Sequence, residues 1–232
     1  MAQDLKIRVI LPATMNGVFR DRVREAYKSV ARPETVFDIV SIKTGPVTIE
    51  SHYDEALALL PALEEVKKAE HEGYDGIIIY CGGDPGLEAA RELVKIPVVG
   101  IGQASIYIAA LIGHKMSIIS PLENLKPLYD NLLRANGIES SKVASVRALS
   151  LSVLELQDVE KTKTAIIEAS KRAMEDGADV IVLGCGSMLG MFEEIGQKIG
   201  IPVIGPEAAV CVTEGLISLE ATHSRRYYEK QL

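Results

Sequence analysis

The sequence predicts an α/β protein built from two similar lobes, each a mostly parallel β-sheet flanked by helices. Short Val/Ile-rich runs alternate with helix-period segments along the whole chain. The strand runs are continuously apolar, as expected for parallel strands that are buried on both faces. The pattern also restarts near residue 115. A length of 232 residues suits two lobes of about 100 residues each.

The first half of the chain contains four predicted strands, separated by helices. The strands are expected at residues 7–13, 36–42, 76–81 and 97–102. Helical periodicity, such as that of Ala56, Leu59, Leu63 and Val66, predicts helices between them. These helices are expected at residues 18–30, 54–71, 87–94 and 104–113.

The second half repeats this order. Strands are expected at residues 115–121, 143–149, 179–185 and 202–206, and helices at residues 122–137, 159–176 and 207–220. The predicted domains are therefore residues 1–114 and residues 115–211, with residues 212–232 packing back onto the first lobe.

Two segments of the chain form an internal repeat, residues 74–105 and residues 178–209. Cys81 follows Asp75 by six residues, and Cys185 follows Asp179 by six. Each cysteine precedes a glycine, and an Ile-Pro-Val strand follows 16 or 17 residues later. The match covers a strand, a turn, a helix and a strand. It predicts lobes related by a pseudo-two-fold axis, with an active-site cleft between them.

Composition excludes several classes of protein. The net charge of −7 and the scattered Lys and Arg residues argue against a nucleic-acid partner. No apolar run approaches the roughly 20 residues that span a bilayer, and no signal peptide precedes the first strand, so a cytoplasmic protein is expected. Three cysteines without a Cys-x-x-Cys pair and four scattered histidines argue against disulfides and zinc. Neither a metal nor a cofactor is expected.

Cys81 and Cys185 are the candidate reactive groups. Both fall at the carboxyl ends of predicted parallel strands, where α/β proteins bind ligands. The following glycines let backbone N–H groups approach a ligand, and a nearby helix N-terminus is expected to lower each thiol pKa. Two opposed thiols suit inversion of a stereocentre, because one removes a proton and the other donates one. A lone cysteine is more often a small buried hydrophobe, and this is the role expected for Cys211.

Three stretches carry a family resemblance: "YCGGDPGLEAARELVKIPVVGI", "VIVLGCGSM" and "GPVTIESHYDEA". Together they resemble the hydantoin racemase branch of the aspartate/glutamate racemase superfamily, over residues 7–218. The resemblance implies a two-lobed, cofactor-independent homo-oligomer. It further implies that two cysteines racemise 5-monosubstituted hydantoins, a small-molecule substrate class to which allantoin also belongs.

Site residues carry over from the resemblance position by position. Cys81 and Cys185 match the catalytic cysteines. The positions that match substrate-binding residues are Pro12, Thr14, Gly45, Pro46, Gly82, Gly83, Ser120 and Gly186. Leu11 and Ala13 stand where many relatives carry Asn. Asp84 is expected to cap a helix, with a contact to a substrate nitrogen as the alternative.

Other functions remain open at this point. An allantoin racemase, or an amino-acid racemase of the aspartate/glutamate type, shares the two thiols, but the latter needs charged residues around a free amino acid. A maleate isomerase or a decarboxylase is a further relative, and such decarboxylases need only one cysteine. A non-catalytic, two-lobed protein that binds a small metabolite would use the same glycine-rich strand ends and would need neither thiol.

Overall fold

The computed structural model describes residues 4–15 and 17–228. The described chain divides into two compact units. One unit comprises the described residues up to 49, residues 53–101 and the described residues from 209 onward. The other comprises residues 50–52 and 102–208. The domain limits expected from the sequence stay a prediction.

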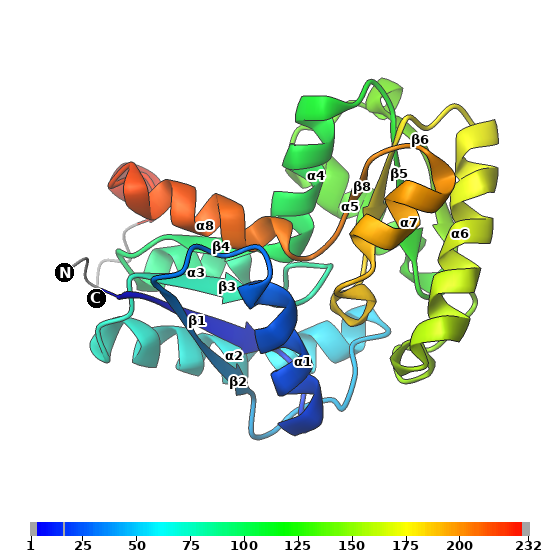
Figure 1. Ribbon diagram of the computed structural model, residues 1–232. Helices are drawn as coiled ribbons and strands as arrows, with labels where there is room; N and C mark the ends of the chain where they lie inside the picture. The colour runs from blue at the N-terminus through cyan, green and yellow to red at the C-terminus, as the bar shows by residue number, and fades with distance from the viewer. Residues whose placement is uncertain (1–3, 16, 229–232) are drawn as a thin grey trace. The chain divides into compact units, whose positions relative to one another are not determined.

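The sheet of the first unit has four parallel strands in the order β2-β1-β3-β4 (Figure 1). Val9 in the central strand lies opposite Ile39 on one side and Ile78 on the other. The strands are β1 (Leu5–Leu11), β2 (Thr35–Ser41), β3 (Gly76–Ile79) and β4 (Val98–Gly100).

Helices cover both faces of this sheet. The helices of the unit are α1 (Gly17–Lys28), α2 (His52–His71), α3 (Leu87–Leu93), α8 (Ala208–Ser218) and α9 (Arg225–Tyr228). Ile77 and Ile79 of β3 share a core with α2 and α3. On the other face, the ring of Tyr27 in α1 makes edge-to-face contacts with the rings of Phe37 and Tyr80. The alternation along β3 therefore sends successive side chains into two separate layers.

The second unit repeats the arrangement with the strand order β6-β5-β7-β8. Its parallel strands are β5 (Met116–Ser120), β6 (Val143–Ala148), β7 (Val180–Leu183) and β8 (Val203–Ile204). One face packs on α4 (Ile101–Ile112) and α5 (Lys126–Ala135), the other on α6 (Val159–Glu175) and α7 (Phe192–Ile199). Short 3₁₀ turns are η1 (Glu123–Leu125), η2 (Ser140–Lys142), η3 (Glu155–Gln157) and η4 (Gly186–Met188).

The predicted fold class is confirmed. Both sheets are parallel, four-stranded and ordered alike, and both carry helices on each face. The internal repeat corresponds to β3-α3-β4 in one unit and β7-α7-β8 in the other. The pseudo-two-fold axis and the cleft remain predictions.

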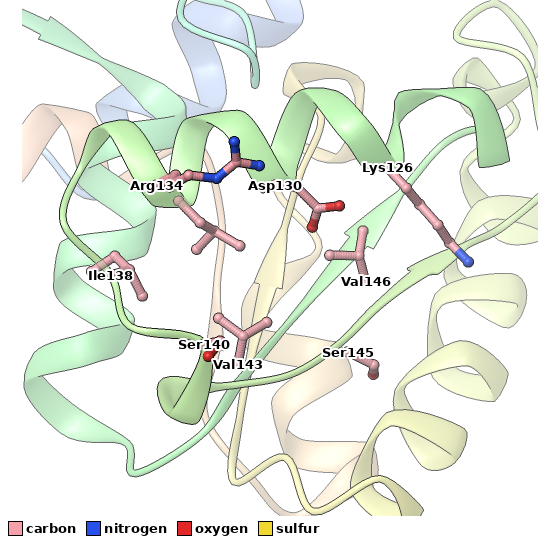
Figure 2. A pocket seen from close by; sticks show the side chains of 9 residues that line it. Lys126, Asp130, Arg134, Ile138, Ser140, Val143, Ser145 and Val146 are labelled. Atoms are coloured by element: carbon pink, nitrogen blue, oxygen red, sulfur yellow. The ribbon is translucent and has the colours of Figure 1, made fainter.

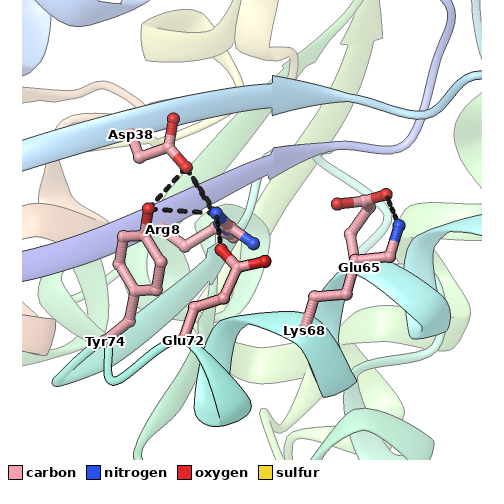
Figure 3. A network of polar contacts seen from close by, with 6 residues as sticks. All are labelled: Arg8, Asp38, Glu65, Lys68, Glu72 and Tyr74. Atoms are coloured by element: carbon pink, nitrogen blue, oxygen red, sulfur yellow. Dashed lines mark hydrogen bonds and ion pairs between the residues drawn. The ribbon is translucent and has the colours of Figure 1, made fainter.

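The buried cation of Arg8 links neighbouring strands of the first sheet. The Arg8 guanidinium donates to Asp38 at 2.7 Å, to Glu72 at 2.6 Å and to the Tyr74 hydroxyl at 3.0 Å (Figure 3). Its carbon also lies 4.2 Å from the centre of the Tyr74 ring, a cation–π distance. This network, which we call the Arg8 network, joins β1, β2 and the turn after α2.

The C-terminal segment is held against the first unit by polar contacts. The Nε2 atom of His223 accepts the Val98 N–H at 2.7 Å, and Arg225 donates to the Val94 carbonyl at 2.7 Å. Burial, with the charges of Arg91 and Arg225, lowers the pKa of His223 to about 4, so the imidazole stays neutral and can accept this bond. Among the described residues, no helix is both long and apolar enough to cross a bilayer.

The core position predicted for Cys211 is wrong. Helix α8 buries Ala209, Val210, Thr213 and Glu214, and Cys211 is exposed. Helical spacing places those four side chains on one face, and Cys211 lies outside it. An apolar sequence around a cysteine therefore did not identify which face of the helix was buried.

Candidate functional site

Cys81 lies two residues beyond the carboxyl end of β3. The Tyr80 N–H donates to the Ile10 carbonyl at 2.8 Å, which extends the pairing with β1 up to the cysteine. A tight turn follows, in which the Asp84 N–H donates to the Cys81 carbonyl at 3.0 Å. Asp84 has φ 51°, a left-handed conformation that is uncommon outside glycine. The half-buried thiol thus stands on a sharply turned segment at the end of a central strand.

The loops after β1 and β2 meet at the same edge of the first sheet. The Thr14 N–H and hydroxyl both donate to the Pro46 carbonyl, at 2.9 Å and 3.3 Å. Gly45 has φ 137°, and a Cβ there would lie 2.7 Å from the Ile42 Cδ1 atom. The structure therefore brings together the predicted residues Thr14 and Pro46, and Gly45 precedes Pro46 in the same loop.

Cys185 occupies the equivalent position beyond β7 in the second unit. The Gly184 N–H donates to the Ile119 carbonyl at 2.9 Å, and the Tyr129 hydroxyl donates to the Gly184 carbonyl at 2.7 Å. The Ser187 N–H points at the thiol, with 3.5 Å between the nitrogen and the Cys185 Sγ. A backbone donor is thus already aimed at the sulfur, as stabilisation of a thiolate requires.

Ser120 ends the neighbouring strand β5. It is fully buried, and its hydroxyl donates to the Leu122 carbonyl at 2.9 Å. Its predicted contact with a substrate stays a prediction.

The pKa of the Cys185 thiol is raised to about 11, chiefly by burial. The hydrogen bonds from Ser187 lower it, and the negative charge of Glu50 raises it further. The sequence-based expectation of a lowered pKa is therefore wrong for Cys185. Cys185 is the N-cap residue of the single-turn η4, whose Ser187 N–H its sulfur accepts, but helix α7 begins only at Phe192, and one 3₁₀ turn does not offset desolvation. Cys185 is protonated at neutral pH, the state that a proton donor needs.

The helix cap predicted for Asp84 is also wrong. Helix α3 begins at Leu87, and its N-cap residue is Gly86 rather than Asp84. Asp84 contributes its backbone instead, because its carbonyl accepts the Leu87 N–H at 3.2 Å.

Comparison with known proteins decides the family. Residues 7–213 match the model of the family described as Asp/Glu/Hydantoin racemase. The chain belongs to this family. It is 37% identical to a hydantoin racemase from Pseudomonas sp. (strain NS671), over 98% of this chain and 93% of that protein. A hydantoin racemase from Paenarthrobacter aurescens is 35% identical over 93% and 92% of the two chains.

A solved structure agrees with this assignment. The allantoin racemase from Klebsiella pneumoniae has a TM-score of 0.93 and 33% identity, over 98% of this chain and 94% of that one. The resemblance read from the sequence is confirmed, and the enzyme class is that of the family, an isomerase of the racemase kind.

Two residues near Cys185, Ser187 and Glu50, received no role in the sequence analysis, although both lie in the stretches that carry the family resemblance. Ser187 follows Cys185 by two residues, a spacing that local turn geometry makes visible in retrospect. Glu50 lies in the second unit, where its Oε1 atom accepts the Val153 N–H at 2.8 Å and its carbonyl accepts from Asn124 at 2.8 Å. Its influence on Cys185 crosses more than a hundred residues of chain, and no local pattern encodes it.

Glu50→Gln should lower the pKa of Cys185 below about 11, because the substitution removes a negative charge that disfavours the thiolate. The glutamine oxygen still accepts the Val153 N–H. The pH dependence of alkylation of Cys185 measures the shift, in a background with Cys81 and Cys211 changed to Ser. Glu155→Gln, on an exposed carboxylate, is the matched control. A midpoint that stays in place or rises would contradict the assignment.

One cavity of the second unit is lined by other residues. A pocket of about 660 Å³ lies between α5 and β6 (Figure 2). It is lined by Lys126, Asp130, Leu133, Arg134, Ile138, Ser140, Val143, Ser145 and Val146. None of the predicted site residues of this racemase lines it. Within residues 4–15 and 17–228, no three His, Cys, Asp or Glu side chains form a group that could hold a metal.

Proposed function

We propose that this racemase inverts C5 of 5-monosubstituted hydantoins by proton transfer between Cys81 and Cys185, without a cofactor. One observation carries the proposal. The two thiols follow equivalent strands, β3 and β7, of two sheets with the same strand order. Proteins that are named hydantoin racemases and match most of the chain support the substrate class.

In the proposed reaction one thiolate removes the C5 proton and the opposed thiol delivers a proton to the other face of the carbon. Among the described residues, neither cysteine takes part in a disulfide. The protonated state of Cys185 suits the delivering role for one enantiomer, with the roles exchanged for the other. Each turnover moves one proton out and one in, so no redox partner is needed.

The substrate ring makes this chemistry accessible. The C5 hydrogen lies between a carbonyl and a ring nitrogen, and the carbanion delocalises into the carbonyl as an enolate. Backbone N–H groups of Gly82, Gly83 and Gly186 are the proposed donors to the developing oxyanion. Gly45 and Pro46 are proposed to lie beside the C5 substituent.

Allantoin is the second candidate substrate, since it is itself a hydantoin. The high similarity to the Klebsiella pneumoniae allantoin racemase favours it specifically. A free amino acid is disfavoured, because none of the proposed site residues is a lysine or arginine that would pair with its carboxylate.

The proposal is tested with optically pure substrates in deuterated buffer that contains a chelator. We expect 5-alkyl or 5-aryl hydantoins, or allantoin, to lose optical rotation and gain deuterium at C5, after subtraction of the uncatalysed rate. Aspartate and glutamate serve as comparison substrates. Racemisation of these amino acids but no hydantoin would overturn the substrate class, and binding without turnover would favour the metabolite-binding alternative.

A further inference from the structure

Glu207 is a buried carboxyl that the proposed reaction does not use. It lies in the turn between β8 and α8 and is 3% exposed. Its Oε1 atom accepts the Gly190 N–H at 2.5 Å. Among the described residues, its Oε2 atom is buried and has no hydrogen-bond partner. A carboxyl is costly in such a place unless it does something that an apolar side chain would not.

The carboxyl of Glu207 connects the Cys185 turn to the end of the fourth strand. Gly190 follows Cys185 by five residues, just after η4. The Oε2 atom packs directly on Gly205, where an added Cβ would clash with it. Gly205 is itself fixed, because its carbonyl accepts the buried Ser105 hydroxyl of α4 at 3.1 Å. Glu207 therefore anchors the cysteine turn to a rigid part of the second unit.

The first unit has a counterpart. Asp84, 6% exposed, places its carboxyl against Gly100, which ends β4. Gly100 and Gly205 are equivalent in the internal repeat, and so are Gly86 and Gly190, both left-handed with φ 74° and 69°. Each half thus buries a carboxyl against a glycine at the carboxyl end of its fourth strand. The carboxyl comes from the cysteine turn in one half and from beyond the strand in the other.

We propose that Glu207 is a positioning residue, whose carboxyl fixes the Gly190 end of the Cys185 turn and so holds the thiol and the Ser187 N–H in their reacting geometry. Only the expected effect of Glu207 on kcat rests on the proposed function; the positioning of Cys185 does not. Burial raises the pKa of Glu207 above the ordinary value for a glutamate. The Gly190 N–H needs only an acceptor at Oε1, which a side-chain amide oxygen also supplies.

The test compares Glu207→Ala with Glu207→Gln in full-length protein that carries Cys211→Ser. Glu207→Ala should lower kcat about 30-fold with little change in KM, because a displacement of about 1 Å at a reacting group costs up to about 100-fold. It should also speed alkylation of Cys185 about tenfold at pH 8, since a released turn exposes the thiol and lowers its pKa by about one unit. Glu207→Gln keeps the acceptor for Gly190, so its kcat and its rate of Cys185 alkylation should both be near those of the parent. Alkylation of Cys81 should not change.

Glu214→Ala is the matched control. Glu214 is a second buried glutamate, 4% exposed, and accepts the Arg32 N–H at 3.0 Å and the Thr35 hydroxyl at 2.5 Å in the first unit. Its loss should lower the melting temperature without altering Cys185 alkylation, which separates positioning from general destabilisation. If Glu207→Ala does not fold, Glu207→Asp replaces it, because the shorter side chain withdraws from Gly190 and predicts the same alkylation change.

Unchanged alkylation of Cys185 in Glu207→Ala or Glu207→Asp would overturn the inference, and so would a Glu207→Gln variant as impaired as Glu207→Ala. The alkylation readout does not require racemase activity. If both single cysteine-to-serine variants racemise normally, the proposed function fails, while the effect of Glu207 on Cys185 is decided separately.

Discussion

Cys81→Ser and Cys185→Ser should each lower kcat for inversion of the hydantoin by about 1,000-fold or more. A serine hydroxyl is a far weaker acid than a thiol, so at neutral pH it neither ionises to a base nor readily donates its proton, and the whole contribution of one acid–base group is lost. The substitution removes little volume, and both cysteines are only half-buried, so the fold should be retained. Chiral chromatography of the two enantiomers over time measures the rates.

Deuterium exchange distinguishes the two-base mechanism from a single base. In deuterated buffer, each single variant keeps one thiol on one face of C5. Such a variant should therefore exchange the C5 hydrogen of one enantiomer without inverting it, and the two variants should select opposite enantiomers. The double variant should exchange neither.

Cys211→Ser provides the internal control, because this third cysteine is exposed on α8 and should behave as the parent does. A Cys81 or Cys185 variant that inverts at the parental rate would remove that thiol from the mechanism. Exchange of the same enantiomer by both variants would place the thiols on one face and end the two-base assignment.

The parts of the fold that the sequence predicted are those encoded by local patterns. The uninterrupted apolar run ending at Ile79 predicted a strand buried on both faces, and β3 is such a strand. The spacing of Cys81 and Cys185 within the repeat predicted equivalent places after two strands, and the topology agrees. Burial of a strand, its direction and its turn are all specified within some ten residues of chain.

Properties set by contacts between distant segments were not predicted. The pKa of Cys185 depends on how much of the second unit covers it and on Glu50, neither of which a ten-residue window contains. A helix and a strand separate Glu207 from Gly190 in the sequence, and the local stretch "GPEAA" does not indicate that its carboxyl is buried. The prediction for Cys211 was wrong for a related reason, since the sequence of an apolar helix does not show which face of the helix is buried.

Arg8→Met should destabilise the first unit by about 2–3 kcal/mol. The variant keeps an apolar stem of similar length and removes only the cation of the Arg8 network. Asp38 and Glu72 then lie close together without the group that holds them, and the Tyr74 ring loses its cation–π partner. Breaking a buried ion pair costs about 3–5 kcal/mol, and the two carboxylates, 38% and 48% exposed, recover part of that cost from solvent. Urea denaturation at pH 7 measures the loss as a lower midpoint.

Lys68→Met is the matched control, because it removes an exposed cation from the same region and leaves the buried cation of Arg8 in place. Lys68 pairs with Glu65 one turn away on α2 and is 48% exposed (Figure 3). Its loss should cost no more than about 0.5 kcal/mol, the usual range for an exposed helical pair. Arg8→Lys should recover little of the stability, because one ammonium cannot reproduce the planar fork that reaches Asp38, Glu72 and Tyr74 together. Equal losses in Arg8→Met and Lys68→Met would mean that burial of Arg8 adds nothing to stability, and that the Arg8 network holds β1, β2 and the turn after α2 together no better than an exposed ion pair would.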